Sequence, residues 1–460
     1  MAALFVVNFR NTVLLAVVVA LLGAYLYWIE RPAIERAKRA SLILEFETAD
    51  VDHVALTSKG ETIEATREDG AWKITAPITA PADGRAIETL IRTAAEAQQS
   101  RTIEPENGDL APFGLEEPEA VLQLHRGDVA LPSLSIGKGT PIGFSAYARL
   151  GQEDVVLLTG GTVRAALVKT LADLREKKIL SFDQNDVEQL TIRPRDGPQV
   201  ELHRATDASA AGTQWQLTAP TAAPAADQAM RSFFSALSAL RAVDFLAERG
   251  ADAEASRGLT PPAYEVRLDG ADQKRITIRI GNAVDVGDKE LIALTVQGDP
   301  QIYLVASHVP SSLGKSANDL RDKRVLRVLP DAVSKIRVRR RDAAGFELAR
   351  SDSGWTLADG EKTDARAAQR FVDDLLELEG SDIVLEDGTL ADLGVPVAEV
   401  EIDLVGDEDL LLTTVRLART DDDGTPRHLA STADKPVVYA VRDFVYSRVT
   451  HSPEDLKSTD

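Results

Sequence analysis

Histidine is the side chain that most often supplies acid–base or metal chemistry near neutral pH, and the sequence contains six histidines. No two of them have the spacing of a metal-binding pair on one helix face, and the motif His-Glu-x-x-His is absent. We therefore expect each one to be a surface residue or a hydrogen-bonded core residue. The six are His53, His125, His203, His308, His428 and His451.

A second candidate for chemistry is Gly314-Lys315-Ser316, which resembles the end of a phosphate-binding loop. That motif requires a glycine five residues before its second glycine, and this chain has Val309 there. The stretch also leads into a predicted helix, whereas a phosphate-binding loop follows a buried strand. These features favour a structural role over a nucleotide site.

The densest acidic cluster is Asp421-Asp422-Asp423-Gly424. Its oxygens could bind a cation, but Asp-Gly is also the typical sequence of a tight hairpin turn, which we favour. No Gly-x-Ser-x-Gly nucleophile elbow is present, and no carboxylate pair stands out among 73 acidic residues. We therefore expect no enzyme, with no catalytic, cofactor-binding or metal-binding residues and no cofactor.

Composition limits the class of protein further. A length of 460 residues suggests about three domains. The net charge of −21 argues against nucleic acid as a partner, because a phosphate backbone needs a clustered basic face. The absence of cysteine excludes disulfides, redox pairs, thiolate metal sites and a cysteine nucleophile.

The N-terminal region contains a run without charged residues from Thr12 to Ile29. Its 18 positions are enough to cross a hydrocarbon core of about 30 Å as a helix. Tyr25, Tyr27 and Trp28 crowd its C-terminal end, where aromatic rings favour the membrane interface. A cleaved signal peptide would have a shorter apolar core and a small-x-small site. We therefore predict a single-pass transmembrane helix that contacts the lipid bilayer through residues 12–29.

Two features give opposite orientations for this predicted helix. Basic residues are more numerous after the run than before it, which would place the following chain in the cytoplasm. However, a short N-terminus followed by a long domain is the usual layout of a signal anchor, and long domains translocate largely regardless of charge. We expect a location in the inner membrane, with the C-terminal domain in the periplasm. Arg31 to Leu44 is predicted to continue the helix as a stalk.

The rest of the chain repeats itself. Trp72, Trp215 and Trp355 occupy similar sequences at spacings of 143 and 140 residues, which favours a core position in each repeat over a ligand groove. Two further landmarks recur in the same order: a Gly-Leu-x-x-Pro-like segment at Gly114, Gly258 and Gly394, and a closing segment at Leu174–Leu180, Leu320–Leu326 and Pro453–Leu456. These landmarks divide the chain into an anchor with stalk (residues 1–45) and three modules (46–182, 183–328 and 329–460).

Each module is predicted to contain a largely antiparallel sheet with one or two packed helices, which makes the fold class α+β. The first strands are expected at Val51–Leu56, Val187–Ile192 and Val333–Val338. Apolar residues at helical spacing predict helices over Ala82–Ala97, Asp227–Arg241 and Asp364–Leu378.

Further local features are predicted for these modules. Asp227 and Asp364 are the candidate helix N-caps. A single closing helix is expected over Thr162–Leu174. A turn is expected at Gly137-Lys138-Gly139 and again at the matching position of the second module, Gly281.

The repeat, the predicted anchor and the segment Leu-Arg-Asp-Lys-Arg-Val-Leu at 320–326 together resemble the bacterial DUF4340 family, as do the Trp-x-Leu/Ile-Thr-Ala-Pro strands at Trp72 and Trp215. The resemblance covers nearly everything after residue 45. It implies a membrane-anchored protein associated with ABC-type transport systems of the gliding-motility kind, and it implies no catalytic residues.

Three functions are therefore considered. The first is a non-catalytic, membrane-anchored extracytoplasmic scaffold or accessory subunit of an ABC-type transport or motility-linked system, whose partner is a membrane protein complex such as an ABC permease or ATPase. The second is a periplasmic glycan- or peptide-binding module with grooves between its modules. The third is an enzyme of unknown class, which would need polar residues that converge in one module only.

Overall fold

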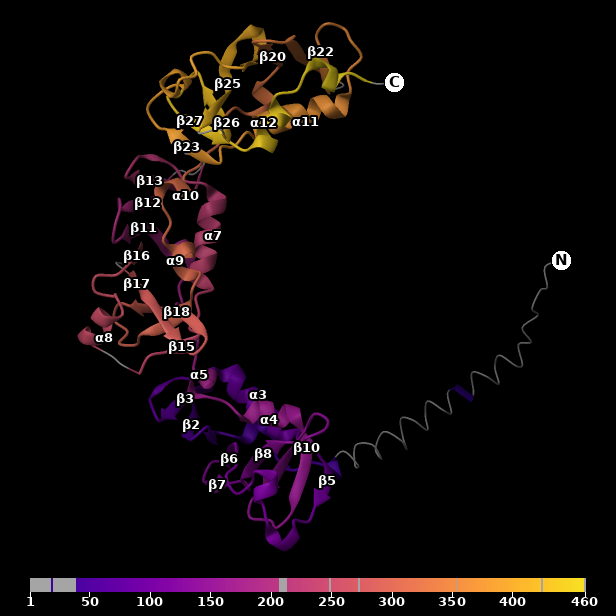
Figure 1. Ribbon diagram of the computed structural model, residues 1–460, viewed down its shortest axis with the longest axis vertical. Coiled ribbons are helices and arrows are strands. Elements are labelled where there is room, and N and C mark those ends of the chain that lie inside the picture. The colour runs from indigo at the N-terminus through magenta and orange to yellow at the C-terminus, as the bar shows by residue number, and fades with distance from the viewer. Residues whose placement is uncertain are drawn as a thin grey trace, which may run out of the picture. The chain divides into compact units, whose positions relative to one another are not determined.

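The computed structural model describes residues 18–19, 39–206, 213–247, 250–271, 274–352, 354–422 and 425–458 (Figure 1). The chain forms two compact units, Met1–Ile179 with Arg241–Phe245, and Leu180–Leu240 with Leu246–Asp460. Apart from Val18 and Val19, the predicted transmembrane run lies outside the described residues. Within the described residues, the structure contains no helix with the length and apolar character needed to cross a membrane.

The first unit contains a ten-stranded antiparallel sheet, and its order is β4-β3-β2-β1-β6-β8-β9-β10-β5, with β7 paired to β6. Alternating burial along β1 and β2 shows that one face of the sheet packs on the core. The strands are β1 (His53–Ser58), β2 (Glu61–Glu68), β3 (Ala71–Ala76), β4 (Ala80–Pro81), β5 (Gln99–Ile103), β6 (Ala120–Arg126), β7 (Val129–Ala130), β8 (Leu134–Gly139), β9 (Ser145–Leu150) and β10 (Val156–Gly160).

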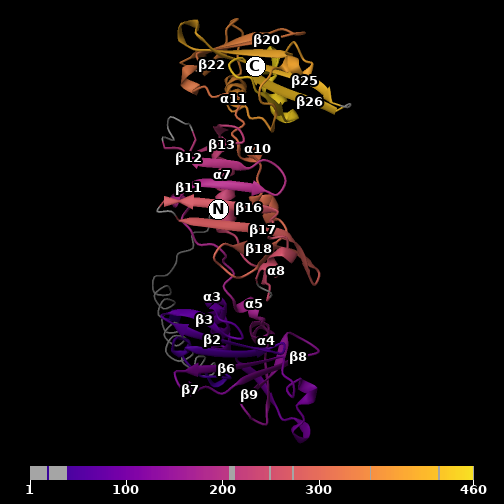
Figure 2. The same ribbon diagram turned by 90° about the vertical axis from the view of Figure 1, so that its left-hand side faces the viewer.

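The second sheet repeats this order. In the second unit its strands run β14-β13-β12-β11-β16-β17-β18-β19, and Figure 2 shows most of them side by side. The strands are β11 (Val187–Pro194), β12 (Val200–Arg204), β13 (Trp215–Ala219), β14 (Ala223–Pro224), β16 (Tyr264–Gly270), β17 (Arg275–Val286), β18 (Lys289–Val296) and β19 (Tyr303–Ala306). The short strand β15 (Asp244–Phe245) belongs to the first unit.

The third sheet, also in the second unit, has the order β22-β21-β20-β24-β25-β26-β27-β23. Three largely antiparallel sheets with a few packed helices confirm the predicted α+β class, with strands in the majority. The strands are β20 (Lys335–Arg340), β21 (Phe346–Ser351), β22 (Gly354–Leu357), β23 (Asp382–Leu385), β24 (Val400–Val405), β25 (Leu411–Asp422), β26 (Thr425–Thr432) and β27 (Val438–Val441).

Each sheet is accompanied by one long amphipathic helix, as predicted: α3 (Gly84–Ala95), α7 (Asp227–Ser238) and α11 (Ala365–Leu376). Asp364 caps α11 as expected, because its carboxylate accepts hydrogen bonds from the backbone of Arg366 and Ala367. The prediction for Asp227 was wrong. Ala226 occupies the N-cap position of α7, and the Asp227 carboxylate instead accepts a hydrogen bond from the backbone N–H of Gln214.

The single closing helix predicted over Thr162–Leu174 is also wrong, because the structure has two short helices there, α4 (Gly161–Leu167) and α5 (Leu171–Leu174). The Thr170 side chain caps α5 in a reciprocal capping box with Asp173, which begins a new helix instead of extending the first. The second unit has the corresponding pair α9 (Val309–Leu313) and α10 (Ala317–Leu320), and the third sheet has α12 (Asp443–Val449). Helix α8 (Ala251–Ser256) precedes the second Gly-Leu-x-x-Pro segment.

The turn predicted at Gly137-Lys138-Gly139 is part of strand β8 instead, at an irregularity in the pairing of β8 with β9. A Cβ on Gly137 would lie 2.2 Å from the carbonyl oxygen of Phe113, and one on Gly281 would lie 2.4 Å from that of Arg257. Both glycines therefore allow the Gly-Leu-x-x-Pro segment to pass directly against a strand. The recurrence of glycine at these two positions was identified correctly, but the reason for it is the close approach of two backbone segments and not a turn.

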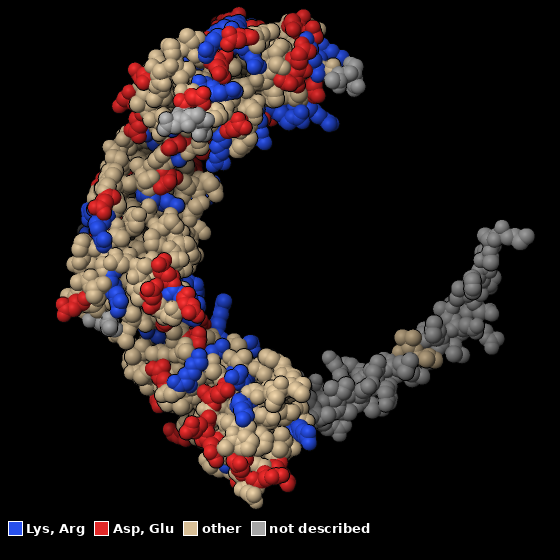
Figure 3. Space-filling view, in the orientation of Figure 1, with Lys and Arg blue, Asp and Glu red and all other residues tan. Residues whose placement is uncertain are grey.

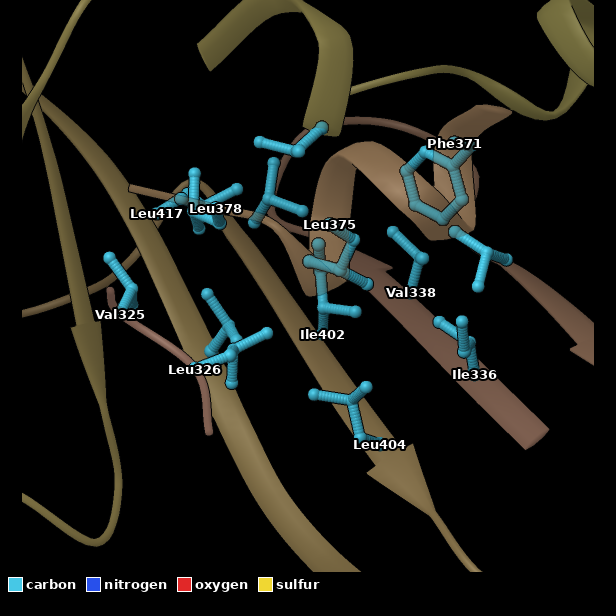
Figure 4. Close-up of a cluster of buried hydrophobic side chains, with 14 of the residues drawn as sticks. Val325, Leu326, Ile336, Val338, Phe371, Leu375, Leu378, Ile402, Leu404 and Leu417 are labelled. Carbon is cyan, nitrogen blue, oxygen red and sulfur yellow. The ribbon is translucent and has the colours of Figure 1, made fainter. Parts of the chain in front are cut away.

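The three repeat tryptophans are buried, with 3–5% of their surface exposed, which confirms the core position predicted for them. In the third module the core brings Trp355 together with Phe371 of α11 and aliphatic residues of the sheet. Figure 4 shows that Val325 and Leu326 also point into this core, although they precede the first strand of the sheet. The aliphatic end of the segment Leu320–Leu326, called the linker below, is thus part of the third core.

Main-chain pairing joins this linker, and the corresponding segments elsewhere in the chain, to the ends of the long helices. The start of the linker pairs just before α7, where the N–H of Ala226 donates to the carbonyl of Leu320 at 2.8 Å. Its end pairs just after α11, where the N–H of Val325 donates to the carbonyl of Leu378 at 2.9 Å. The same two kinds of bridge recur along the chain: Ala82↔Arg175, Ala225↔Arg321 and Thr363↔Lys457 before the helices, and Leu42↔Gln98, Lys178↔Arg241 and Arg324↔Glu379 after them.

The predicted stalk lies mostly outside the described residues. From Ser41 onward the chain is not helical, because Ser41 accepts a hydrogen bond from the N–H of Gln99 at 2.7 Å and Leu42 forms the bridge to Gln98. Ile43 and Leu44 are buried in the first core. The prediction of a helix as far as Leu44 was therefore wrong for residues 41–44, where the chain pairs with the first module.

We expect Leu326→Ala to lower the free energy of unfolding of the third module by about 2–4 kcal/mol, because it leaves a cavity in a closely packed core. Leu329→Ala, three residues further on at a side chain that is 76% exposed, should change it by less than about 0.5 kcal/mol. Urea-dependent hydrogen exchange of third-module peptides in the full chain measures both. Similar effects of the two substitutions would contradict the assignment of Leu326 to the core.

Candidate functional site

The second unit contains a cleft of about 500 Å³ between its two sheets. Helix α7 forms one wall, the end of α11 and helix α12 form the opposite wall, and the linker forms the floor. The cleft therefore lies where the main-chain bridges bring the linker beside both long helices. Its position follows from the same pairing that holds the sheets.

Charged side chains of both signs line this cleft. The bases are Arg321, Lys323, Arg442 and Arg448, and the acids are Asp319, Asp374, Glu377 and Glu379. Figure 3 shows blue and red side chains interspersed over the third module as well. A balanced set of charges suits a polar partner that carries both signs, and it is unlike the one-sided basic face that recognises nucleic acid.

Some of these charges are already paired. Arg321 binds Glu386 at 2.8 Å and is largely buried, and Arg448 lies 3.4 Å from Asp374. Lys323 and Arg442 make no ion pair with a described residue, so their charges can meet those of a partner. Phe444 adds an exposed aromatic ring to this wall, with the Arg448 guanidinium 5.6 Å from its centre.

The floor of the cleft is organised by Asp322, whose side chain is almost fully buried. Its carboxylate accepts hydrogen bonds from the Arg324 guanidinium at 2.7 and 2.9 Å and from Arg327 at 3.0 Å. It also accepts one from the backbone N–H of Arg324 at 2.9 Å. Burial alone would raise the pKa of Asp322, but these hydrogen bonds and both guanidinium charges outweigh burial and hold the pKa below its ordinary value.

The Gly314-Lys315-Ser316 stretch leads into this floor. Gly314 ends α9, and a Cβ there would lie 2.5 Å from the Tyr264 ring. The Ser316 hydroxyl caps α10 and donates to the Asp319 carboxylate at 2.7 Å. Burial works to raise the pKa of Asp319, but the Ser316 hydrogen bonds overcome it and lower that pKa. The stretch thus connects two short helices and caps the second.

Helix α12, which carries Phe444 and Arg448, is held by a cluster of polar residues in the third module. His428 on β26 is buried, and its Nε2 lies 3.0 Å from the Asp443 carboxylate at the start of α12. The Tyr446 ring packs on the His428 ring at 4.3 Å, and its hydroxyl donates to Glu399 at 2.7 Å. Burial, followed by this hydrogen bond to Glu399, raises the pKa of Tyr446 well above its ordinary range.

This cluster is the convergence of polar residues in one module that an enzyme would require. Its geometry fits a positioning role, because each pair joins α12 to the sheet beneath it and the His428 ring is covered by Tyr446. No sequence motif predicts this cluster, because only the register of β24 to β27 brings His428, Asp443 and Glu399 together.

Strand pairing also brings two other histidines together. His53 on β1 lies opposite His125 on β6, and their ring centres are 4.8 Å apart. Helical spacing could not reveal this pair because the residues come from separate strands. Nowhere in the described parts of the chain do three or more histidine or acidic residues gather in a group able to hold a metal ion. Of the acidic cluster, Asp421 and Asp422 end β25, whereas Asp423 and Gly424 lie outside the described residues.

Asp322→Asn should destabilise the second unit by about 1–3 kcal/mol, because an amide cannot accept all the hydrogen bonds that the buried carboxylate receives. Asp331→Asn is the matched control. Its side chain is 94% exposed and pairs with Arg350 at 3.1 Å, so its effect should be within about 0.5 kcal/mol of zero. Urea unfolding of the full chain compares them, and equal effects would show that Asp322 is dispensable.

The effect of Asp322→Asn should also depend on pH. Because folding lowers the pKa of Asp322, the ionised carboxylate stabilises the fold at pH values above its ordinary pKa of 3.8. This contribution is lost as the pH falls through the lowered pKa. The difference in free energy of unfolding between the parent and Asp322→Asn should therefore be constant from pH 7 to about 5 and shrink below about 4. A difference that grew on acidification would contradict the inferred ion pairing.

Comparisons with known proteins agree with the repeat. The family model described as "Domain of unknown function (DUF4340)" matches residues 72–214 and, a second time, residues 215–396. The two matches begin at Trp72 and Trp215, which hold equivalent positions in the first two modules. A comparison with curated proteins gives no match. Because the two family matches together cover well over half of the chain, the protein belongs to the DUF4340 family.

Proposed function

We propose that this protein is a non-catalytic, membrane-anchored extracytoplasmic scaffold that serves as an accessory subunit of an ABC-type transport or motility-linked system. In this proposal residues 12–29 cross the inner membrane once, and the three modules lie in the periplasm. The uncharged run supports the anchor. The resemblance described above supports the transport system, with an ABC permease or ATPase as the partner.

The observation that carries the proposal is the repeated pairing between linkers and helix ends. The linker of the second unit forms one bridge before α7 and another after α11, through Arg321 and Arg324. Only two residues separate these bridges, so the connection between the sheets has little freedom to swing. The two sheets of the second unit, joined in this way, present their surfaces at a fixed spacing, which is the physical requirement for a scaffold.

A peptide- or glycan-binding module is the second candidate, and the cleft of the second unit favours it. The cleft is large enough for a few residues of an extended chain, and its Lys323 and Arg442 form no ion pair with any residue that the structure describes. Phe444 supplies a stacking surface there. We place the partner contact of the scaffold on the same wall of α12, so that the two candidates differ in what this wall contacts.

To distinguish the two, Phe444 can be replaced by the photo-crosslinker p-benzoylphenylalanine, which preserves the aromatic ring, in the full chain within intact cells. The scaffold proposal predicts ultraviolet-dependent crosslinks to permease or ATPase subunits, identified by mass spectrometry. The same substitution at Leu410, which is 64% exposed on the turn before β25, is the control and should give at least about tenfold fewer of them.

Crosslinks from Phe444 only to cell-wall glycan or peptide would sink the scaffold proposal and support the binding module. Equal crosslinking from Phe444 and Leu410 would show that the cleft has no special role in contacting a partner.

A further inference from the structure

The three sheets contain equivalent hairpins with very different tips. Strands β8 and β9 hold the same places in the first sheet as β17 and β18 in the second and β25 and β26 in the third. The second hairpin turns through Gly287-Asp288, and in the third hairpin the acidic residues Asp421 and Asp422 end strand β25. The first hairpin instead turns through Thr140-Pro141-Ile142-Gly143-Phe144, which carries no charge.

This first tip exposes large apolar side chains to an unusual degree. Ile142 is 91% exposed and Phe144 is 74% exposed. No charged residue occurs between Lys138 and Arg149, in a chain in which 27% of residues are charged. Apolar groups displayed together on an exposed loop mark a contact surface more often than an isolated apolar residue does.

The tip has a defined conformation. The N–H of Thr140 donates to the carbonyl of Ser145 at 3.0 Å, and the Thr140 hydroxyl donates to the carbonyl of Ile142 at 3.0 Å. The carbonyl of Phe144 accepts a hydrogen bond from the N–H of Gly161 at 3.1 Å, and a Cβ on Gly161 would lie 3.0 Å from the Phe144 ring. The loop therefore presents Ile142 outward on a supported frame.

From these observations we propose that the hairpin tip Thr140–Phe144 inserts Ile142 and Phe144 into the interfacial region of the lipid bilayer. The chemistry fits, because apolar and aromatic side chains favour the interface and the nearby exposed Lys138 can meet anionic headgroups. The inference rests on the membrane anchorage in the proposed function.

Chain length supports a lipid surface as the occupant. Only residues 30–40 separate the end of the uncharged run from Ser41, which is already paired with the first module. Eleven residues span at most about 40 Å even when fully extended. An anchored chain therefore keeps the first module near the bilayer, where two inserted side chains act at a high effective concentration. The hairpins that carry acidic residues near their ends, Asp288 in the second sheet and Asp421 and Asp422 in the third, belong to modules that are further along the chain from the anchor.

The absence of cysteine allows a direct test. Ile142→Cys carries an environment-sensitive fluorophore in the full chain, reconstituted into vesicles of phosphatidylethanolamine and phosphatidylglycerol. Asp288→Cys, at the tip of the second hairpin, is the matched control. Lipids with a nitroxide near the headgroup should quench the probe at residue 142 at least about twofold more than the probe at residue 288. Iodide in the water should quench the probe at residue 288 more than the probe at residue 142.

Equal quenching at the two positions would overturn the proposal while leaving anchorage intact, since flotation of the chain with the vesicles reports anchorage separately. Failure to float would overturn anchorage, and with it the insertion of the tip. Shielding of residue 142 from iodide without quenching by nitroxide lipids would also overturn the proposal, because it would identify a protein contact in place of lipid.

Discussion

Main-chain pairing between the linker Leu320–Leu326 and the two long helices beside it is the interaction on which the second unit depends. The N–H of Asp322 donates to the carbonyl of Pro224 before α7, and the N–H of Val325 donates to the carbonyl of Leu378 after α11, each at 2.9 Å. Backbone groups that are buried need partners, so a linker of this kind is held by both helices at once. The spacing between the second and third sheets follows from this short doubly paired segment.

The apolar and charged side chains of the linker have different roles. Val325 and Leu326 enter the third core, where their burial stabilises the contact. Asp322 remains beneath the surface with its charge satisfied by two guanidinium groups. Arg321 and Lys323 point to the cleft, one of them paired with Glu386 and the other free to meet a partner. The same seven residues thus join the modules and form the floor of the candidate site.

The sequence was sufficient for features that depend on periodicity and repetition. The strands, the long helices and the cap at Asp364 follow from patterns within a short window, and the buried tryptophans follow from their recurrence along the chain. Features that depend on long-range register could not be predicted. Asp227 was expected to cap α7, but it contacts the backbone of Gln214, and His428 meets Asp443 only after the third sheet has formed. Grooves between modules were considered only in general for a binding module, and the residues that line this cleft were not predicted, although the linker sequence in its floor had been recognised as a repeat.

The linker Leu320–Leu326 is an integral part of the core that it enters. Hydrogen exchange of the full chain, resolved to individual amides, can measure how firmly the linker is held. We expect the amides of Asp322, Val325 and Gly380, all donors in the pairing around the linker, to exchange as slowly as those of the neighbouring strand β20. Exchange of these amides at the rate of an exposed loop, while β20 stays protected, would instead show that the second and third sheets are joined by a loose tether.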